Sequence, residues 1–288
     1  MDMGNARNLR GRPLVERLAG FIQQTSSSLP EDAEQALRKA ARREAKGSSA
    51  RMILDTLLDN VKVARTAGTP VCQDTGTLTF FVSESLRRRV TPAVLGMAVA
   101  LATEKGWLRR NTNDPVTGRS IDTNVCPGAP VVHYVDGDGE GRISLLMKGG
   151  GSENMSCQMS LPDAGIGAGR DLEGVRRAVL SAVHRAQGYG CAPGILGVCI
   201  GGDRASGFEE AKLQLLRGLE DSNPDSALAR LERRILRDAN TLGIGPMGLG
   251  GKTTLLAVKI GARPRVPASF FVTVAYLCWA ARRRSITL

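Results

Sequence analysis

The sequence predicts an α+β fold (mixed α/β), in which a helical N-terminal layer packs on mixed β-sheets. Residues 13–67 show helical periodicity without an intervening strand pattern. Farther along, short runs rich in β-branched and aromatic residues occur between amphipathic helices, without strict alternation of the two. Glycine-rich joints follow several of these runs, so a candidate site is expected at strand ends and glycine loops.

The elements can be justified in order from the N-terminus. Residues 1–12 lack the apolar core of a signal peptide and are expected to form a flexible tail on a single domain that spans 13–288. The best-defined helix of the first layer carries an apolar stripe and ends at Gly68. The next helix is predicted to begin after Thr91, a good N-cap residue, and to close at Gly106.

The remaining elements follow from the same periodicity rules. Asp171 is expected to cap the first of the later helices, and Gly188 to end it. Further helices are predicted at 208–220 and 225–243. Strands are predicted at 78–82, 129–135, 142–148, 194–200, 254–260 and 270–276.

The composition excludes several classes of function. The net charge is +11, but the basic residues are spread over many segments, several of them interleaved with Glu as on solvated helix faces. Aromatic residues make up only 4%, too few for a base-stacking surface, so no nucleic acid partner is expected. No apolar run reaches the ~20 residues of a membrane span. We therefore expect no membrane association, a cytoplasmic location, and a small anionic substrate or an acidic partner chain.

The stretch GIGPMGLGGKTT, residues 243–254, resembles a phosphate-binding loop. In such a loop a glycine stands five residues before the glycine of the GK[ST] triplet, but here that position is Pro246, which has no N–H to offer a phosphate. The flanks also differ, because the predicted order is helix, loop and strand rather than strand, loop and helix. Nucleotide binding is therefore not expected, and the role of Lys252 is left open.

Six cysteines are present, and none forms a CxxC pair, which disfavours a zinc ribbon or a thioredoxin-type site. Cys72, Cys191 and Cys278 lie at the ends of predicted elements, beside glycine turns or after a strand. Cys126 also lies in a turn, and the residues alone do not decide among the six. Cys157 and Cys199 are expected to be buried thiols that pack as small apolar side chains.

Four segments resemble class I fumarase and L(+)-tartrate dehydratase. They are VCQDTGT, MKGGGSEN, CAPGILGVCIGGDR and LGIGPMGLGGKTTLLAVKIG, the last continuing to PASFFVTVAYLCW. The resemblance covers roughly 51–284 and is closest to the α-subunit of the two-chain form, or the N-terminal domain of the fused form. It implies a [4Fe-4S] cluster with one open iron, held by Cys72, Cys191 and Cys278, with Cys126 as the rival ligand to test. An open iron acts as a Lewis acid on substrate.

The resemblance also implies the reaction, which is reversible addition or removal of water on a small dicarboxylate. Gln73 and Asp74 are expected to touch the substrate or an iron-bound water, although Asp74 also suits a plain turn. Arg109 is expected to pair with a substrate carboxylate, since a guanidinium matches both oxygens. Arg110 is adjacent, so the resemblance does not decide which of the two arginines pairs with the carboxylate.

Two further features follow from the resemblance. The backbone of Gly149 and Gly150 is expected to form the carboxylate-binding turn. Val266 stands where many members of the family carry His, and neither His133, in a predicted strand, nor His184, on a helix surface, replaces it.

The leading hypothesis is the α-subunit of an iron–sulfur hydro-lyase that converts fumarate to malate. L(+)-tartrate dehydratase and mesaconate hydratase are alternatives within the class, and a non-catalytic cluster-binding paralogue is the alternative outside it. The chain supplies no convincing base for the C–H proton and ends ten residues after Cys278. We therefore expect a separate β-subunit and an α2β2 particle.

Overall fold

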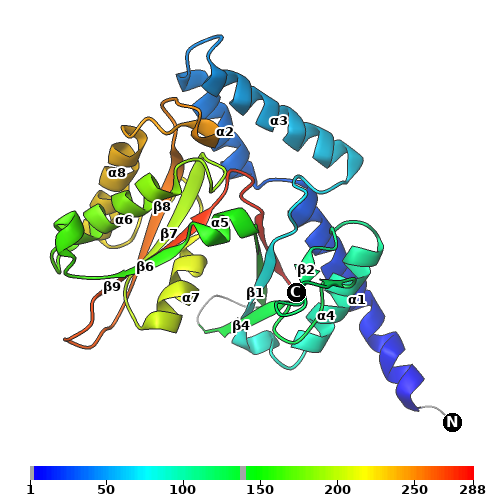
Figure 1. Ribbon diagram of the computed structural model, residues 1–288. Coiled ribbons are helices and arrows are strands. Elements are labelled where there is room, and N and C mark those ends of the chain that lie inside the picture. Colours follow the sequence, from blue (N-terminus) through cyan, green and yellow to red (C-terminus); the bar gives the residue numbers. More distant parts are fainter. Residues whose placement is uncertain (1–2, 137–140) are drawn as a thin grey trace. The chain divides into compact units, whose positions relative to one another are not determined.

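Three helices cover most of residues 13–67, as their periodicity predicts. They are α1 (Met3–Ser27), α2 (Glu31–Arg43) and α3 (Ser49–Ala67) (Figure 1). The computed structural model describes residues 3–136 and 141–288. Helix α1 begins at Met3, so residues 3–12 of the expected tail are helical.

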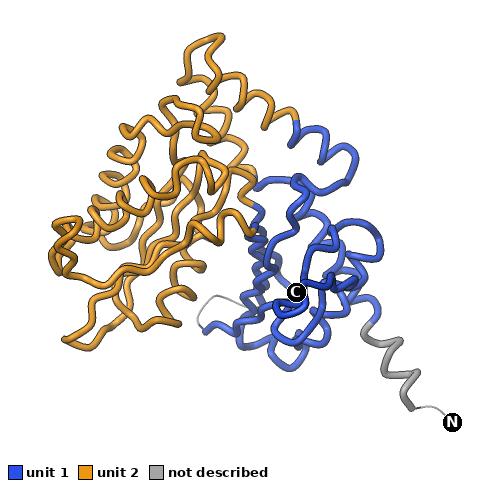
Figure 2. The backbone as a smooth tube through the Cα atoms, viewed as in Figure 1, with its two compact units in different colours: residues 1–30, 60–149, 282–288 blue, residues 31–59, 150–281 orange. Residues whose placement is uncertain are grey.

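The chain divides into two compact units, each assembled from separate segments (Figure 2). Unit 1 combines 1–30, 60–149 and 282–288, and unit 2 combines 31–59 and 150–281. The break at residue 60 falls inside α3, where the apolar periodicity is continuous. A boundary of this kind leaves no linker signal in the sequence, and the sequence predicts one domain.

Unit 1 contains a four-stranded sheet in the order β10-β5-β1-β4. Strand β1 pairs parallel with β4 and antiparallel with β5, so β4 and β5 are not neighbours although they are consecutive long strands in the sequence. The elements of this unit are β1 (Thr77–Ser83), α4 (Pro92–Glu104), β2 (Thr112–Asn113), β3 (Ser120–Ile121), β4 (Val131–Val135), β5 (Arg142–Lys148) and β10 (Arg283–Thr287), together with α1.

The core of unit 1 lies between this sheet and the helices α1 and α4. Leu18 and Ile22 of α1 and Leu95 of α4 are fully buried against Phe80 and Leu145 of the sheet. Helix α4 begins as predicted, because the Thr91 hydroxyl accepts a hydrogen bond from the Val94 N–H.

Unit 2 contains a second four-stranded sheet in the order β6-β9-β7-β8. Strand β7 pairs parallel with β8 and antiparallel with β9. Consequently the start of β7, the start of β8 and the end of β9 lie at the same edge of the sheet. The elements are α5 (Gly150–Asn154), β6 (Cys157–Ser160), α6 (Leu172–Ala186), β7 (Gly194–Gly201), α7 (Arg204–Gln214), α8 (Ser226–Asn240), β8 (Leu255–Arg263) and β9 (Phe271–Leu277), together with α2.

Helices cover both faces of this sheet. The apolar faces of α6 and α8 form the main core with β7, β8 and β9, and α7 packs on the other face, where Gly197 lets the backbone of Ala211 approach closely. Asp171 caps α6 as predicted, with its side chain accepting from the Gly174 N–H. Both faces are therefore buried, which explains the continuous apolar character of the strands in this sheet.

The mixed α+β class is confirmed, but several elements were not predicted, among them β10, β6, α5 and the two-residue strands β2 and β3. Strand β10 contradicts the expectation that the strand at 270–276 would be the last, because its sequence RRSIT is basic rather than apolar. Strand β6 is an edge strand of four residues, and α5 is a single turn within the glycine-rich joint. No helix of the described residues is long and apolar enough to cross a membrane.

Candidate functional site

The loop from Cys72 to Gly76 joins α3 to β1 in unit 1. Gly76 has φ +74, and a Cβ on it would lie 2.4 Å from the carbonyl oxygen of Lys148 at the end of β5. Only glycine fits both the backbone conformation and this close approach. The loop is thereby docked against the end of the neighbouring strand, as the antiparallel pairing of Thr77 with Lys148 requires.

Asp74 is held in this loop by hydrogen bonds to one of its carboxylate oxygens. Oδ1 accepts from the Gly76 N–H at 2.8 Å and from the side-chain amide of Asn111 at 2.9 Å. The other oxygen faces Gly149, where a Cβ would lie 2.8 Å from Oδ2. The structure thus brings Asp74 and Gly149 together. The bond to Gly76 also makes Asp74 a turn residue, so that alternative is right in part.

The segment that carries Arg109 is fixed by its backbone. The Thr75 hydroxyl accepts from the Arg109 N–H and donates to the Arg109 carbonyl, both at 2.9 Å. The exposed guanidinium of Arg109 projects from this fixed backbone, whereas that of Arg110 forms a surface ion pair with Asp122 at 3.7 Å. Asp122 therefore gives Arg110 a surface partner, which favours Arg109 as the residue available to a ligand.

Asn124 organises this segment, and sequence reasoning missed it. Its side-chain oxygen accepts from the N–H groups of Asn111 and Thr112, and its amide donates to the Arg109 carbonyl at 2.8 Å. Asn124 is 2% exposed and has φ 56, a left-handed conformation that Asn tolerates better than most residues. No local pattern in the sequence marks an asparagine for such a role.

Arg282 is the second residue of this unit that the sequence did not reveal. The basic C-terminal run suggests solvated side chains, yet Arg282 is only 1% exposed. Its Nη2 approaches the position that a Cβ on Gly149 would occupy, at 3.7 Å. Nε and Nη1 are buried without a hydrogen-bond partner among the described residues. A permanent positive charge is therefore buried beside Asp74 and Gly149.

In unit 2, Cys191 and Cys278 lie at the same edge of the sheet. Cys191 precedes β7 and Cys278 follows β9, and the N–H of Trp279 donates to the carbonyl of Cys191 at 3.2 Å. Cys191 is exposed with φ 56, whereas Cys278 is buried. The two cysteines thus lie at the same end of one sheet within unit 2.

The loop at 243–254 braces the turn that contains Cys191. The Met247 N–H donates to the Ala192 carbonyl at 2.9 Å, and Gly188 packs directly on the Met247 carbonyl. The Lys252 N–H, which a phosphate-binding loop would aim at its ligand, donates to both carboxylate oxygens of Glu44. The order of α8, loop and β8 is as predicted, and the internal carboxylate argues against a phosphate at this N–H.

The other cysteines lie in different environments. Cys199 is fully buried, and desolvation raises the pKa of its thiol to about 12. Burial also raises the pKa of Cys157, which contacts the guanidinium of Arg185 at 3.4 Å. Cys199 fits the predicted role of a buried thiol, whereas Cys157 is only partly buried and packs against the core from its margin. Cys126 forms a tight turn with Ala129 in unit 1 and lines a surface hollow beside α4.

Val266 lies in the loop between β8 and β9. In this sheet that loop is at the edge opposite to the one where Cys191 and Cys278 lie. Within unit 2, therefore, the absence of His at Val266 does not remove a neighbour of the cysteine pair. His133 stacks on Phe81, with ring centroids 5.1 Å apart, and His184 is exposed on α6 as predicted.

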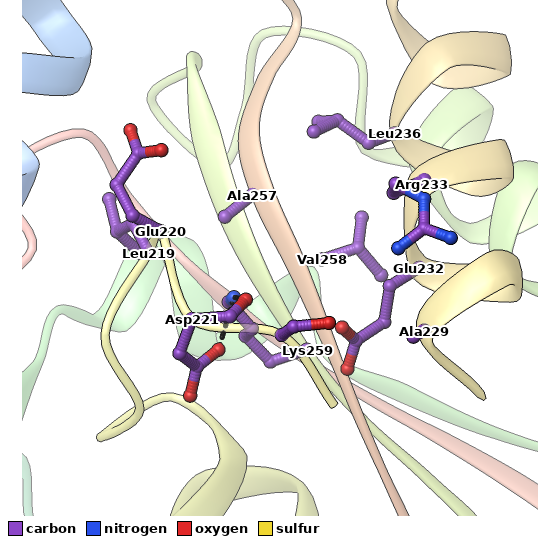
Figure 3. Close-up of a pocket in the computed structure, with 11 residues that line it drawn as sticks. Leu219, Glu220, Asp221, Ala229, Glu232, Arg233, Leu236, Ala257, Val258 and Lys259 are labelled. Carbon is purple, nitrogen blue, oxygen red and sulfur yellow. Dashed lines mark hydrogen bonds and ion pairs between the residues drawn. The ribbon is translucent and has the colours of Figure 1, made fainter. Parts of the chain in front are cut away.

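A separate cavity of about 280 Å³ lies beside α8 and β8 (Figure 3). Most of its charged groups already have partners within the unit. Lys259 donates to the carboxylate and the carbonyl of Asp221, and Glu232 accepts from Arg217 and Asn223. This cavity is consistent with a structural ion-pair network rather than a ligand site.

Residues 15–287 match the family described as Fumarate hydratase (Fumerase). The chain belongs to this family. Membership confirms the resemblance to class I fumarate hydratase and the α-subunit of L(+)-tartrate dehydratase.

Three relatives illustrate the similarity. A provisionally named fumarate hydratase class I from Geobacillus stearothermophilus is 45% identical over 95% of this chain, and the chain spans about half of that relative's length, 54%. A provisionally named L(+)-tartrate dehydratase subunit alpha from Methanocaldococcus jannaschii is 35% identical over 88% of the chain and 90% of the relative. The L(+)-tartrate dehydratase subunit alpha of Escherichia coli (strain UTI89 / UPEC) is 30% identical, over 95% and 90% respectively.

The family implies an iron–sulfur cluster, and unit 2 contains two of the three cysteines expected to hold it. Among the described residues, no group of three or more His, Cys, Asp or Glu side chains is gathered as a metal site. Cys72 belongs to unit 1, and Cys191 and Cys278 belong to unit 2. The buried hydroxyl of Tyr276, in the same unit, has no hydrogen-bond partner among the described residues. Thiolates such as those of Cys191 and Cys278 are the ligand type that iron–sulfur clusters use, and the Tyr276 hydroxyl is a hydrogen-bond donor of the kind that a cluster sulfur accepts.

Proposed function

We propose that the chain is the α-subunit of a [4Fe-4S]-dependent hydro-lyase that reversibly adds water to a small dicarboxylate. The observation that carries the proposal is the contact between Asp74 and Gly149. A carboxylate oriented by Asn111 and Gly76 lies against a side-chain-free backbone position, two residues after Cys72. Glycine at this point lets a ligand approach the backbone closely.

The chain's own residues have distinct roles in this proposal. Arg109 binds one substrate carboxylate, and the fixed backbone beneath it limits the entropy lost on binding. Asp74 directs Oδ2 toward Gly149, where this oxygen can accept a proton from the substrate's hydroxyl group or from the water that adds to the substrate. Gln73 is exposed beside it and can donate and accept hydrogen bonds. Backbone groups at Gly149 and Gly150 bind the second carboxylate.

Cys72, Cys191 and Cys278 hold the cluster, with one iron left open. When bound, the cluster supplies a Lewis acid for the substrate's hydroxyl and carboxylate. Serine at any of the three should remove most of the iron from anaerobically reconstituted protein. Serine at Cys157 or Cys199 is the matched control and should leave the iron content unchanged. Loss of iron from Cys126→Ser together with retention in Cys278→Ser would refute this ligand set.

Fumarate and malate are the proposed substrate pair. The relative named for fumarate hydratase is 45% identical, whereas those named for L(+)-tartrate dehydratase are 35% and 30% identical. L(+)-tartrate dehydration and mesaconate hydration are the alternatives within the class. The deciding measurement is kcat/KM for each of these dicarboxylates with one preparation. An intact cluster with no turnover on any of them would favour a non-catalytic paralogue.

A separate β-subunit completes the enzyme in this proposal, as an α2β2 particle. The chain spans 90% of two relatives named as α-subunits but 54% of the fumarate hydratase relative. The two histidines of the chain do not lie in the Asp74 loop: His133 stacks on Phe81, and His184 is exposed on α6. The test is to assay the reconstituted α-chain alone and again after addition of the β-chain. Full turnover by the α-chain alone would refute the requirement.

A further inference from the structure

The turn that contains Cys191 closes over the aromatic ring of Tyr276. A Cβ on Gly190 would lie 2.5 Å from Cε1 of this ring, and a Cβ on Gly194 would lie 2.3 Å from Cζ and 2.4 Å from the hydroxyl oxygen. Any side chain at either position would collide with the ring. The segment 190–194 therefore lies on the ring through its two glycines, with Cys191 between them.

The position of Tyr276 is fixed from the other side by β9. Its N–H donates to the Ser156 hydroxyl at 3.1 Å, and it pairs with Leu196 across the sheet. The residue is 2% exposed. The ring is thus a rigid platform, and the N–H of Trp279, three residues along the chain, donates to the carbonyl of Cys191.

The hydroxyl of Tyr276 has no hydrogen-bond partner among the described residues, although it is fully buried. Leaving such a donor without an acceptor costs roughly 1–3 kcal/mol. Phenylalanine would provide the same ring without that cost, so packing alone does not account for tyrosine. A buried hydroxyl in this place implies an acceptor that is present in the working protein.

Two cysteines lie next to this tyrosine, one along the chain and one on the turn that packs on its ring. Cys278 follows Tyr276 by two residues at the end of β9, and Cys191 lies on the turn above the ring. Hydrogen bonds to the sulfurs of an iron–sulfur cluster raise its reduction potential and orient its ligands.

We propose that Tyr276 is a positioning residue for the cluster: its ring supports the Cys191 turn, and its hydroxyl donates a hydrogen bond to a sulfur of the bound cluster or its thiolate ligands. The inference rests on the proposed function, since the acceptor is the cluster. It assigns the ring and the hydroxyl separate tasks, which a single substitution can separate.

The test compares Tyr276→Phe with the unchanged protein, and uses Tyr189→Phe as the matched control. Tyr189 lies in the same connection but is 75% exposed. In the metal-free form, Tyr276→Phe should unfold at the same temperature as the unchanged protein or higher, because a buried donor without an acceptor is removed. After anaerobic reconstitution the order should reverse. The variant should lose iron to a chelator about threefold to tenfold faster and show a lower cluster reduction potential.

The outcomes separate this inference from the proposed function. If the unchanged protein takes up no iron, the proposed function is refuted, and this inference with it. If the unchanged protein and Tyr276→Phe hold equal iron, release it at equal rates and show the same reduction potential, the inference alone is refuted. A loss of stability in the metal-free Tyr276→Phe protein would also refute it, by showing that the hydroxyl already has a structural partner. Tyr189→Phe should match the unchanged protein throughout.

Discussion

Replacing Gly149 with Ala tests the contact on which the proposed function depends. The added Cβ would lie 2.8 Å from Oδ2 of Asp74, whereas ordinary contact begins at 3.4 Å. Asp74 cannot simply swing away, because its other oxygen is held by Gly76 and Asn111. The backbone at Gly149 does not need a positive φ, so the effect comes from the collision alone.

The expected magnitude follows from that geometry. Overpacking of this kind costs about 1–3 kcal/mol, which for a chain of this size lowers Tm by several degrees. A displacement of several tenths of an ångström at Asp74 should lower kcat by about tenfold to a hundredfold, since a 1 Å misplacement can cost about a hundredfold. The assay is steady-state turnover of the reconstituted enzyme, with Tm measured alongside by calorimetry.

Two further variants make the result decisive. Gly20→Ala lies inside helix α1 with nothing within 4 Å of the added Cβ, and should leave turnover unchanged while stabilising the helix by about 0.5–1 kcal/mol. In an Asp74→Ala background, Gly149→Ala should add little, because the group it displaces is gone. Turnover of Gly149→Ala within twofold of the unchanged enzyme would refute the reasoning.

Three other predictions follow from single contacts. Arg109→Met should cost about 2–5 kcal/mol of transition-state stabilisation, measured as a lower kcat/KM in steady-state kinetics, while Arg110→Met should change kcat/KM little. A larger loss in Arg110→Met than in Arg109→Met would assign the substrate carboxylate to Arg110. Glu44→Ala should reduce the free energy of unfolding in urea by roughly 1–3 kcal/mol, since the Lys252 N–H loses its acceptor; an unchanged urea midpoint would contradict this. Hydrogen bonding from arginine lowers the pKa of Glu173 to about 2, so its contribution is present above about pH 4.5 and is lost as the pH falls toward 2. Near neutral pH, Glu173→Gln should therefore be less stable than the unchanged protein, by less than about 1 kcal/mol because the side chain is partly exposed. At pH 2 the free energies of unfolding of the two proteins should match, and a difference that stays constant with pH would refute the sign.

The sequence predicted the local structure well where the determinants are local. Helix starts at Thr91 and Asp171 follow from side chains that cap their own backbone within three residues. The proline at Pro246 and the order of the flanking elements argued against a nucleotide loop without any knowledge of Glu44. The failures were equally local in origin: β10 is too basic and β6 too short to be recognised as strands.

The candidate site was predicted in part. Cys191 and Cys278 could be placed at strand ends from the sequence, and the pairing of β7 with β8 and β9 then brings those ends to one edge. Asn124 and Arg282 could not be found, because neither carries a local signal. Their importance comes from burial and from hydrogen-bond geometry with residues far away in the chain.

By itself the sequence determined the mixed fold class, the helix boundaries set by caps and glycines, and the family to which the chain belongs. These depend on the order of side chains along a few turns or on long ordered motifs. Only the tertiary structure decided that β1 separates β4 from β5, that Arg282 is buried beside Asp74, and that the Tyr276 ring lies under the Cys191 turn. Each of these results from close packing between distant segments, where a glycine, a ring or a charge acquires its role only from the atoms against which it is folded.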